Sequence, residues 1–237
     1  THLVKDYKDG TNVYRALNDL SFEIKKGASV GLIGESGSGK STISKLMVKL
    51  EKLDSGSIEF DFKNNKPLSS NIQMIFQDPF AALNPALKVG SMLEEVLNKH
   101  QSELSKLEKE QTLNNLLIKV GLTPEDANKY PNEFSGGQRQ RLCIARALAA
   151  KPVLLICDES TSALDLSVQA QILNLLKELQ VTENLSILMI THSMAVAAWF
   201  CQYLVLLKNG EIVEQGPSMQ LIKHSTNGYT KALLAHT

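Results

Sequence analysis

The sequence predicts an α/β fold with a mostly parallel sheet. Runs typical of strands alternate with helical patterns along the 237 residues, and several strand-like runs are continuously apolar, as strands covered on both faces must be. Such alternation is typical of a parallel sheet flanked by helices. The predicted strands are residues 19–24, 29–33, 57–62, 72–76, 153–157, 186–190 and 203–207. The predicted helices are residues 40–50, 138–150, 168–179 and 194–201.

Residues 79–133 are predicted to form a helical subdomain inserted between two halves of this core. The stretch has no convincing strand, and Thr123-Pro124 is typical of a helix start, a capping residue followed by proline at the first helical position. The core is then expected to comprise residues 1–78 and 134–237.

Composition excludes several classes of protein. The 25 Lys and Arg residues balance 25 Asp and Glu residues, so the net charge gives no electrostatic footprint for nucleic acid. The cysteines are odd in number and none are spaced as C-x-x-C, which argues against a disulfide framework and against a zinc site. We expect all three to be small buried hydrophobic residues: Cys143, Cys157 and Cys201.

The chain is not predicted to span a membrane. Its longest apolar run, residues 194–207, is too short for a helix crossing roughly 20 residues of bilayer, and no signal peptide opens the sequence. The first residues look like the middle of a strand, so we expect some residues upstream to be missing. If the protein works at a membrane, other chains must span it.

A glycine-rich loop predicts phosphate binding. Residues 34–41 match G-x-x-x-x-G-K-[ST], with an apolar strand before them and a helical pattern after them. The glycines let backbone N–H groups turn toward phosphate oxygens, and the following helix presents its positive end to the same anion. Lys40 is placed to reach the β- and γ-phosphates, and Ser41 offers a hydroxyl to Mg²⁺. The residues expected to contact the nucleotide here are Gly34, Glu35, Ser36, Gly37, Ser38, Gly39, Lys40, Ser41 and Thr42.

Two acids end the predicted strand 153–157 and predict hydrolytic chemistry. A parallel strand delivers its last side chains to the sheet edge where α/β proteins bind ligands. Asp158 is the expected carboxylate for Mg²⁺, and Glu159 is the candidate to orient or deprotonate the attacking water. His192 follows another apolar strand by two residues, and we expect it to contact the γ-phosphate.

At this point the sequence resembles the ABC-type ATPases. The segment Phe134-Ser-Gly-Gly-Gln-Arg-Gln-Arg141 resembles their signature motif, with phenylalanine where leucine is commoner. Gln77 resembles the Q-loop glutamine, which the resemblance makes a catalytic residue and a Mg²⁺ ligand beside Ser41 and Asp158. Residues 162–165 resemble the D-loop, and Thr191-His192 the switch histidine. The resemblance further implies nucleotide contacts from Tyr7 (the A-loop aromatic, with Tyr14 as runner-up), Ser135, Gly136, Gly137, Gln138 and Asp165.

The resemblance implies an architecture and a set of partners. The fold would be a P-loop ABC-type ATPase core with a mostly parallel sheet, an N-terminal antiparallel β region and the helical subdomain. Two such chains would pair head to tail, each ATP lying between the phosphate loop of one chain and the signature of the other. The pair would sit at the cytoplasmic face of the membrane against two permease subunits, with an extracellular substrate-binding protein as an indirect partner. Nucleic acid is not expected as a partner.

Within the family, three stretches resemble the motor subunits of peptide and nickel importers: residues 74–85, 130–134 and 157–171. Peptide-importing members often carry a long C-terminal extension, whereas this sequence ends soon after residues 228–234. That favours uptake of nickel or another metal, possibly as a chelate, with di- and oligopeptide import as the alternative. Such systems imply a similar but non-identical ATPase as the immediate partner. Ser160 follows Glu159 where many members have proline, and we expect no loss of chemistry.

Other classes of function stay open. A soluble ABC-type ATPase of DNA repair, chromosome structure or translation is disfavoured, because long coiled coils and a second cassette are both missing from the sequence. A regulator that binds nucleotide without hydrolysis is disfavoured by Glu159 and His192. An exporter motor is harder to exclude, and only the importer-type stretches oppose it.

Overall fold

The computed structural model describes residues 1–10, 12–160 and 164–235. The chain forms two compact units, Thr1–Asn65 with Glu183–Thr237 and Lys66–Thr182. The predicted helical subdomain lies inside the second unit, and its boundaries stay a prediction.

The first unit begins with an antiparallel pair. Strands β1 (Leu3–Asp9) and β2 (Asn12–Leu20) are hydrogen-bonded, with Tyr7 directly opposite Tyr14. Directly opposite residues of an antiparallel pair share one face of the sheet, so both rings lie on the same side. The pair is the antiparallel β region that the resemblance implied.

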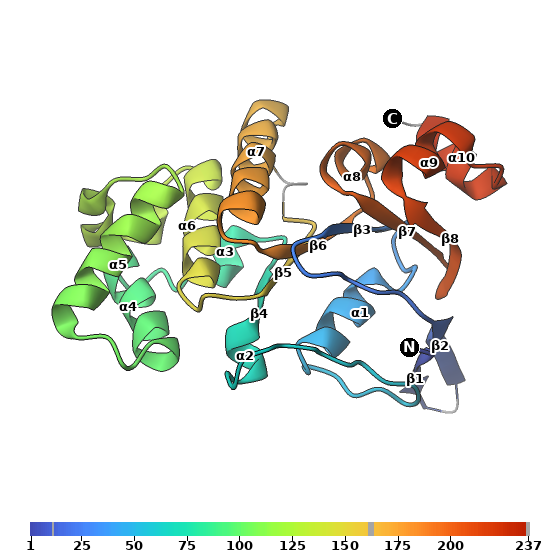
Figure 1. Ribbon diagram of the computed structural model, residues 1–237, viewed down its shortest axis with the longest axis horizontal. Coiled ribbons are helices and arrows are strands. Elements are labelled where there is room, and N and C mark those ends of the chain that lie inside the picture. Colours follow the sequence, from blue (N-terminus) through green and yellow to red (C-terminus); the bar gives the residue numbers. More distant parts are fainter. Residues whose placement is uncertain (11, 161–163, 236–237) are drawn as a thin grey trace. The chain divides into compact units, whose positions relative to one another are not determined.

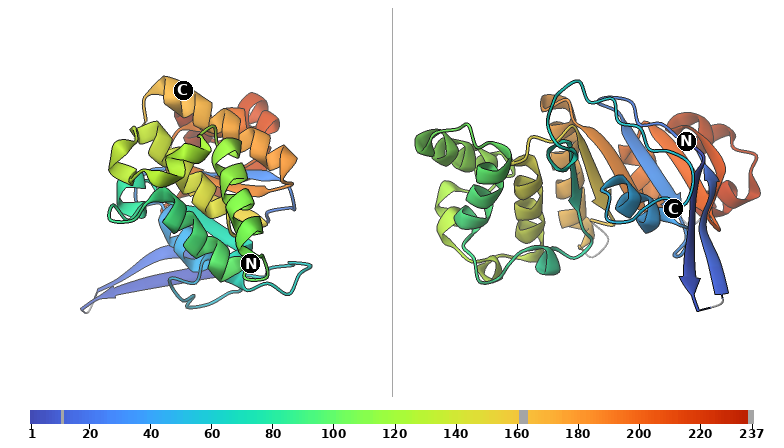
Figure 2. Two further views of the ribbon diagram at one scale, coloured as in Figure 1. Left: turned by 90° about the vertical axis from the view of Figure 1, so that its left-hand side faces the viewer. Right: turned by 90° about the horizontal axis from the view of Figure 1, so that it is seen from below.

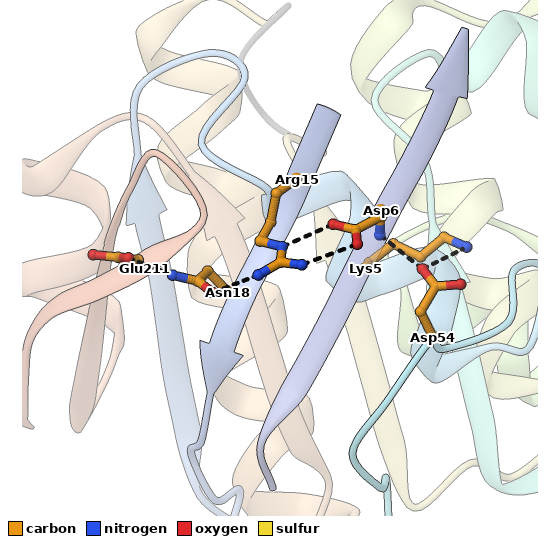
Figure 3. A network of polar contacts seen from close by, with 6 residues as sticks. All are labelled: Lys5, Asp6, Arg15, Asn18, Asp54 and Glu211. Carbon is orange, nitrogen blue, oxygen red and sulfur yellow. Dashed lines mark hydrogen bonds and ion pairs between the residues drawn. The ribbon is translucent and has the colours of Figure 1, made fainter. Parts of the chain in front are cut away.

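A polar network ties this pair to the rest of its unit (Figure 3). Arg15 donates two hydrogen bonds to the carboxylate of Asp6, at 2.9 and 3.1 Å, and these bonds lower the pKa of that carboxyl. The backbone N–H of Asp6 donates to Asp54 at 2.7 Å, and Asn18 donates to Glu211 at 2.6 Å. Both strands are therefore fixed by side chains from other segments of the unit.

Strand β3 (Ser29–Gly34) lies at the centre of the main sheet of this unit. It pairs in parallel with β6 (Ser186–Thr191) on one side and with β7 (Tyr203–Lys208) on the other. Strand β8 (Glu211–Pro217) pairs antiparallel with β7. All six residues of β3 are buried, as the continuously apolar pattern predicted.

Four helices complete the first unit as far as the structure describes it. Figure 1 shows α1 (Lys40–Met47) and α8 (Met194–Phe200) on opposite sides of β3, and both contact that strand. Helix α9 (Ser218–His224) contacts β7 and β8, and α10 (Gly228–Ala235) contacts α8. The sheet is thus covered on both faces, which requires the apolar strands seen in the sequence.

The second unit is built around α6 (Gly136–Leu148). Strands β4 (Ile72–Ile75) and β5 (Leu154–Asp158) pair in parallel, and α6 contacts β4 and also α7 (Leu166–Thr182). In Figure 2 the green ribbons of α4 and α5 lie beside the yellow ribbon of α6, and all three helices are in contact. The remaining elements of this unit are α2 (Leu68–Asn71), α3 (Pro79–Ala82), α4 (Val89–His100), α5 (Lys106–Lys119) and the 3-10 helices η1 (Pro124–Asn128) and η2 (Pro131–Glu133).

Two predicted strands are wrong. Residues 57–62 form no strand, and residues 19–24 are strand only to Leu20. In the first stretch the rings of Phe60 and Phe62 stack on each other with centroids 5.4 Å apart. These aromatic residues therefore pack together without belonging to a hydrogen-bonded strand pair. In the second, Asp19 takes a positive φ of 56°, which departs from the extended strand conformation.

The cysteine prediction is confirmed, because all three thiols are free and buried. Burial raises the pKa of Cys157 to about 12 and that of Cys143 to about 11. Both therefore stay protonated at neutral pH, as inert core residues do.

Candidate nucleotide-binding site

The phosphate loop leaves the buried end of β3 and leads into α1. Gly37 and Gly39 have φ angles of +79° and +106°, in the left-handed region that glycine adopts at little cost. At Gly39 a Cβ would also lie 2.8 Å from the carbonyl oxygen of Ala16 and 2.7 Å from a methyl of Leu17. The spacing of glycines in the sequence is therefore required by this path of the backbone.

Lys40 lies folded back over the loop that precedes it. Its ammonium donates to the carbonyl oxygens of Gly34 at 2.7 Å and Glu35 at 2.8 Å, and the residue is only 6% exposed. A buried ammonium held by two carbonyls gives the loop a fixed positive charge. This is the placement expected of a lysine that contacts phosphate oxygens.

The N-terminus of α1 is suited to an anion. Among the residues that the structure describes, no side chain caps it, and its first turn carries no acid. The positive end of the helix and its first N–H groups therefore face outward beside the Lys40 ammonium. Glycines, lysine and open helix end together fit the phosphates of a nucleotide. Ser41 is exposed in the first turn, where its hydroxyl is available to a cation.

Both candidate A-loop tyrosines lie close to this loop, in different ways. Tyr14 is 57% exposed, and its hydroxyl donates to the carbonyl oxygen of Gly37 at 3.2 Å. The Tyr7 hydroxyl donates to the carboxylate of Glu51, and burial together with that carboxylate raises its pKa. The choice between Tyr7 and Tyr14 as adenine-stacking residue stays a prediction, and the direct loop contact belongs to Tyr14.

In the second unit, the predicted hydrolytic residues leave one edge of the β4–β5 pair. Because Ile75 is opposite Cys157 in the parallel register, Asp158, the last residue of β5, and Gln77, two residues beyond β4, lie at the same edge. Glu159 comes next, with a φ of 46° that a non-glycine residue adopts only at a cost of about 1–2 kcal/mol. Backbone strain of this kind is typical of functional positions.

The signature segment opens helix α6. The hydroxyl of Ser135 accepts from the N–H of Gln138 at 3.3 Å, and the Gln138 side chain accepts from the N–H of Ser135 at 3.0 Å. This reciprocal capping box leaves the N–H groups of Gly136 and Gly137 at the open end of the helix. A Cβ on Gly137 would lie 2.5 Å from a methyl of Val168, so packing of α7 requires glycine there.

His192 and Asp165 each lie at the end of a secondary-structure element, one in each unit. His192 is exposed and directly follows β6 in the first unit. Asp165 accepts from the N–H of Val168 at 2.9 Å and from the Ser167 hydroxyl at 2.8 Å, and these bonds lower its pKa. Asp165 thus caps α7 in this chain, whatever it contacts on a partner. Of the D-loop residues, Ser162 and Ala163 lie outside the described residues, whereas Leu164 is described and half-buried.

Each unit therefore carries part of the predicted set. The phosphate loop, Tyr7, Tyr14 and His192 belong to the first unit, and Gln77, Asp158, Glu159, the signature and Asp165 to the second. One loop contact was not predicted: the hydroxyl of Tyr229 accepts from the N–H of Glu35 at 3.3 Å. The two residues are 194 positions apart, and no motif links them in the sequence.

The fold and the phosphate loop define a P-loop nucleotide-binding α/β protein. A family model described as "ABC transporter" matches residues 17–162. The chain is 42% identical over 243 residues to the oligopeptide transport ATP-binding protein OppF of Bacillus subtilis (strain 168), covering 99% of this chain and 80% of the relative. It is 40% identical over 229 residues to OppF of Haemophilus influenzae, covering 93% of this chain and 69% of the relative.

Similarity to a solved structure leads to the same family. The dimeric post-hydrolysis state of the ATP-binding cassette MJ0796, bound to ADP and Pi, matches with a TM-score of 0.79 and 32% identity, covering 92% of this chain and 97% of that one. The chain belongs to the ABC transporter family. It is an ATPase whose hydrolysis of ATP is coupled to transport. In the part of the chain that the structure describes, no helix is both long and apolar enough to span a bilayer.

Proposed function

We propose that this chain is the ATP-hydrolysing motor subunit of an ABC importer of oligopeptides. The observation that carries the cargo class is the similarity, over nearly the whole chain, to two proteins named for oligopeptide transport. The sequence analysis favoured nickel or a metal chelate, because peptide-importing members often carry a C-terminal extension that was not found in the sequence. The names of the relatives favour the alternative, import of peptides.

The roles proposed for the residues follow from their geometry. The loop from Gly34 to Ser41 holds the phosphates through backbone N–H groups and the Lys40 ammonium. Gln77 and Asp158, at one edge of β4–β5, serve with Ser41 as ligands for Mg²⁺. When bound, Mg²⁺ neutralises charge on the phosphate oxygens. The set contains a single carboxylate, which suits an ion that also takes phosphate oxygens and waters as ligands.

Glu159 is proposed as the group that orients the attacking water or takes its proton. Its strained φ of 46° fixes the start of the side chain immediately after the strand. His192, exposed after β6, is proposed to contact the γ-phosphate. Together these residues hold the water and the phosphate in line, which is most of what an enzyme supplies in phosphoryl transfer.

The signature is proposed to act on the nucleotide of a second ATPase. The open end of α6 offers the N–H groups of Gly136 and Gly137, beside the capping residues Ser135 and Gln138. A helix end of this kind binds anions, and the chain has its own phosphate loop besides. The dimeric state of MJ0796 supports a pair of such chains, and a head-to-tail arrangement of the pair is part of the proposal. A similar but non-identical ATPase is the proposed partner.

The second unit also offers a surface for a permease. A groove of about 720 Å³ runs between α3, α4 and α6, with Phe80, Leu87, His100 and Arg146 among its lining residues. Phe80 and Leu87 are 62% and 36% exposed, and exposed apolar side chains that line a groove are typical of a surface that binds another protein. We propose that this groove receives a permease segment at the cytoplasmic face of the membrane, with two permeases in the complex and a substrate-binding protein outside.

Nucleotide binding and cargo are tested separately. Lys40→Ala is expected to lose most affinity for a fluorescent ATP analogue, whereas Lys223→Ala, an exposed lysine on α9, is the matched control. Unchanged binding of the analogue by Lys40→Ala would refute the assignment of residues 34–41 as the phosphate-binding loop. For cargo, deletion of the chain from its host is expected to abolish uptake of a labelled oligopeptide. Loss of radioactive nickel uptake with intact peptide uptake would reverse the cargo assignment.

A further inference from the structure

The C-terminal helix α10 reaches the phosphate loop through one hydroxyl. Tyr229 accepts from the N–H of Glu35 at 3.3 Å and donates to the carbonyl oxygen of Leu207 at 3.2 Å. Leu207 is the residue opposite Gly34 in the β3–β7 register, so both bonds fall where the loop leaves the sheet. The hydroxyl therefore connects the end of strand β7 with the first peptide of the loop.

Tyr229 is itself held firmly. Asn227 caps the start of α10 by accepting from the N–H of Tyr229 at 2.8 Å. The buried hydroxyl of Thr230 donates to the carboxylate of Glu214 on β8, and the ammonium of Lys208 lies 4.9 Å from the centre of the Tyr229 ring. The backbone around Tyr229 is thus held by Asn227 and Glu214, and Lys208 lies over its ring, so the hydroxyl is placed with little further loss of conformational entropy.

Two side chains consequently grip opposite ends of one residue. The N–H of Glu35 is bound by Tyr229, and its carbonyl oxygen by the ammonium of Lys40 at 2.8 Å. The plane of the peptide between Gly34 and Glu35 sets the direction in which the following loop turns. Displacement of this peptide would move the N–H groups that face the phosphates.

We propose that Tyr229 is a positioning residue for the phosphate loop, and that its hydroxyl, by fixing the Glu35 peptide, tightens the binding of the phosphates of ATP and ADP. The inference rests on the proposed nucleotide site. Tyr229 does not touch the reacting atoms in this account, so it acts on nucleotide affinity and not on the chemical step.

Tyr229→Phe tests this, because it removes the hydroxyl and keeps the ring over Lys208. Both hydrogen bonds are long, so the expected loss of affinity is at the low end for such bonds, about two- to fivefold for ATP and equally for ADP. In the assembled transporter, KM for ATP should rise by the same factor while kcat stays unchanged. Amide hydrogen exchange of the free protein should become faster in residues 34–38.

The matched control is Tyr203→Phe, at the opposite end of β7 from Leu207. It should change neither affinity nor exchange in the loop. Equal affinity loss in both variants, or normal affinity and normal exchange in Tyr229→Phe while Lys40→Ala abolishes binding, would overturn the inference and leave the nucleotide site intact. Normal nucleotide binding by Lys40→Ala would instead refute the proposed nucleotide site, and the inference about Tyr229 would fall with it.

Discussion

The guanidinium of Arg139 lies 3.7 Å from the centre of the Phe80 ring. The same side chain donates to the carbonyl oxygens of Pro131 at 2.6 Å and Asn132 at 3.2 Å, just before the signature segment. Phe80 belongs to α3, which follows Gln77, and borders the groove proposed for the permease. One buried guanidinium therefore joins the groove to the start of the signature helix.

Arg139→Lys should destabilise the protein, because lysine keeps the charge but cannot stack flat on the ring while bonding two carbonyls. We expect a loss of about 2 kcal/mol in the free energy of unfolding, measured by urea denaturation. Arg141→Lys is the control, since Arg141 is more exposed and donates to only one backbone carbonyl, that of Val120, and to the side chain of Gln171. Equal losses in the two variants would contradict a special role for the Arg139–Phe80 contact.

Glu159→Gln should retain ATP binding and lose hydrolysis. A positioned general base typically contributes about 10²–10⁴-fold, so phosphate release in the assembled complex should fall by at least about 100-fold. The slow variant should also accumulate as a nucleotide-bound dimer in size-exclusion chromatography with ATP. Glu110→Gln, on an exposed position of α5, should behave as wild type. Normal hydrolysis by Glu159→Gln would reject the assignment.

Ser135→Arg should slow turnover at the partner's nucleotide while leaving binding at this chain's own loop unchanged. Ser105→Arg provides a close control, because Ser105 and Ser135 cap their helices with the same reciprocal box. Each variant should lose about 1 kcal/mol of stability from the missing cap. Only Ser135→Arg should lower ATPase activity of the complex. Equal activity in the two variants would count against the head-to-tail pair.

Asp126→Asn should destabilise the protein at neutral pH and less so in acid. Burial pushes the pKa of Asp126 upward, but bonds from Lys129 and from Thr123 outweigh it, and the pKa lies below its ordinary value of 3.8. A lowered folded-state pKa gives stability that is present above pH 3.8 and is lost as the pH falls through the folded pKa. The difference in unfolding free energy from wild type should be about 1–2 kcal/mol near pH 7 and should shrink as the pH falls below 3.8. A difference independent of pH would contradict the charged pair.

The sequence predicted most of the fold because its strands are continuously buried and its loop motif is long. Residues 29–33 and 186–190, for example, match β3 and β6 to within a residue at each end. Residues 57–62 alternate Ile58, Phe60 and Phe62 with polar residues, yet form no strand, because strand propensity is realised only where a partner strand is available. The stretch 79–133 is helical, as predicted, although Thr123-Pro124 opens a 3-10 helix.

The residues of the candidate site also fall into two groups, those that the local sequence predicted and those that it did not. Motif spacing located the phosphate loop, the acids after β5 and the capped signature helix, because each depends on neighbours in the chain. The contact of Tyr229 with Glu35 depends on the return of the chain through β7, β8 and α10, and no local pattern encodes it. The cargo stays a proposal, because the sequence favoured nickel or a metal chelate and the relatives' names favour oligopeptides.

The central strand β3 has a consequence for synthesis of the protein. Its parallel neighbours are supplied by residues such as Ile187 and Tyr203, which leave the ribosome long after Ser29 and Val30. Until then a wholly apolar strand emerges without either neighbour, and such segments readily associate with other chains. The nascent polypeptide should therefore need chaperone protection until both neighbours of β3 have been translated.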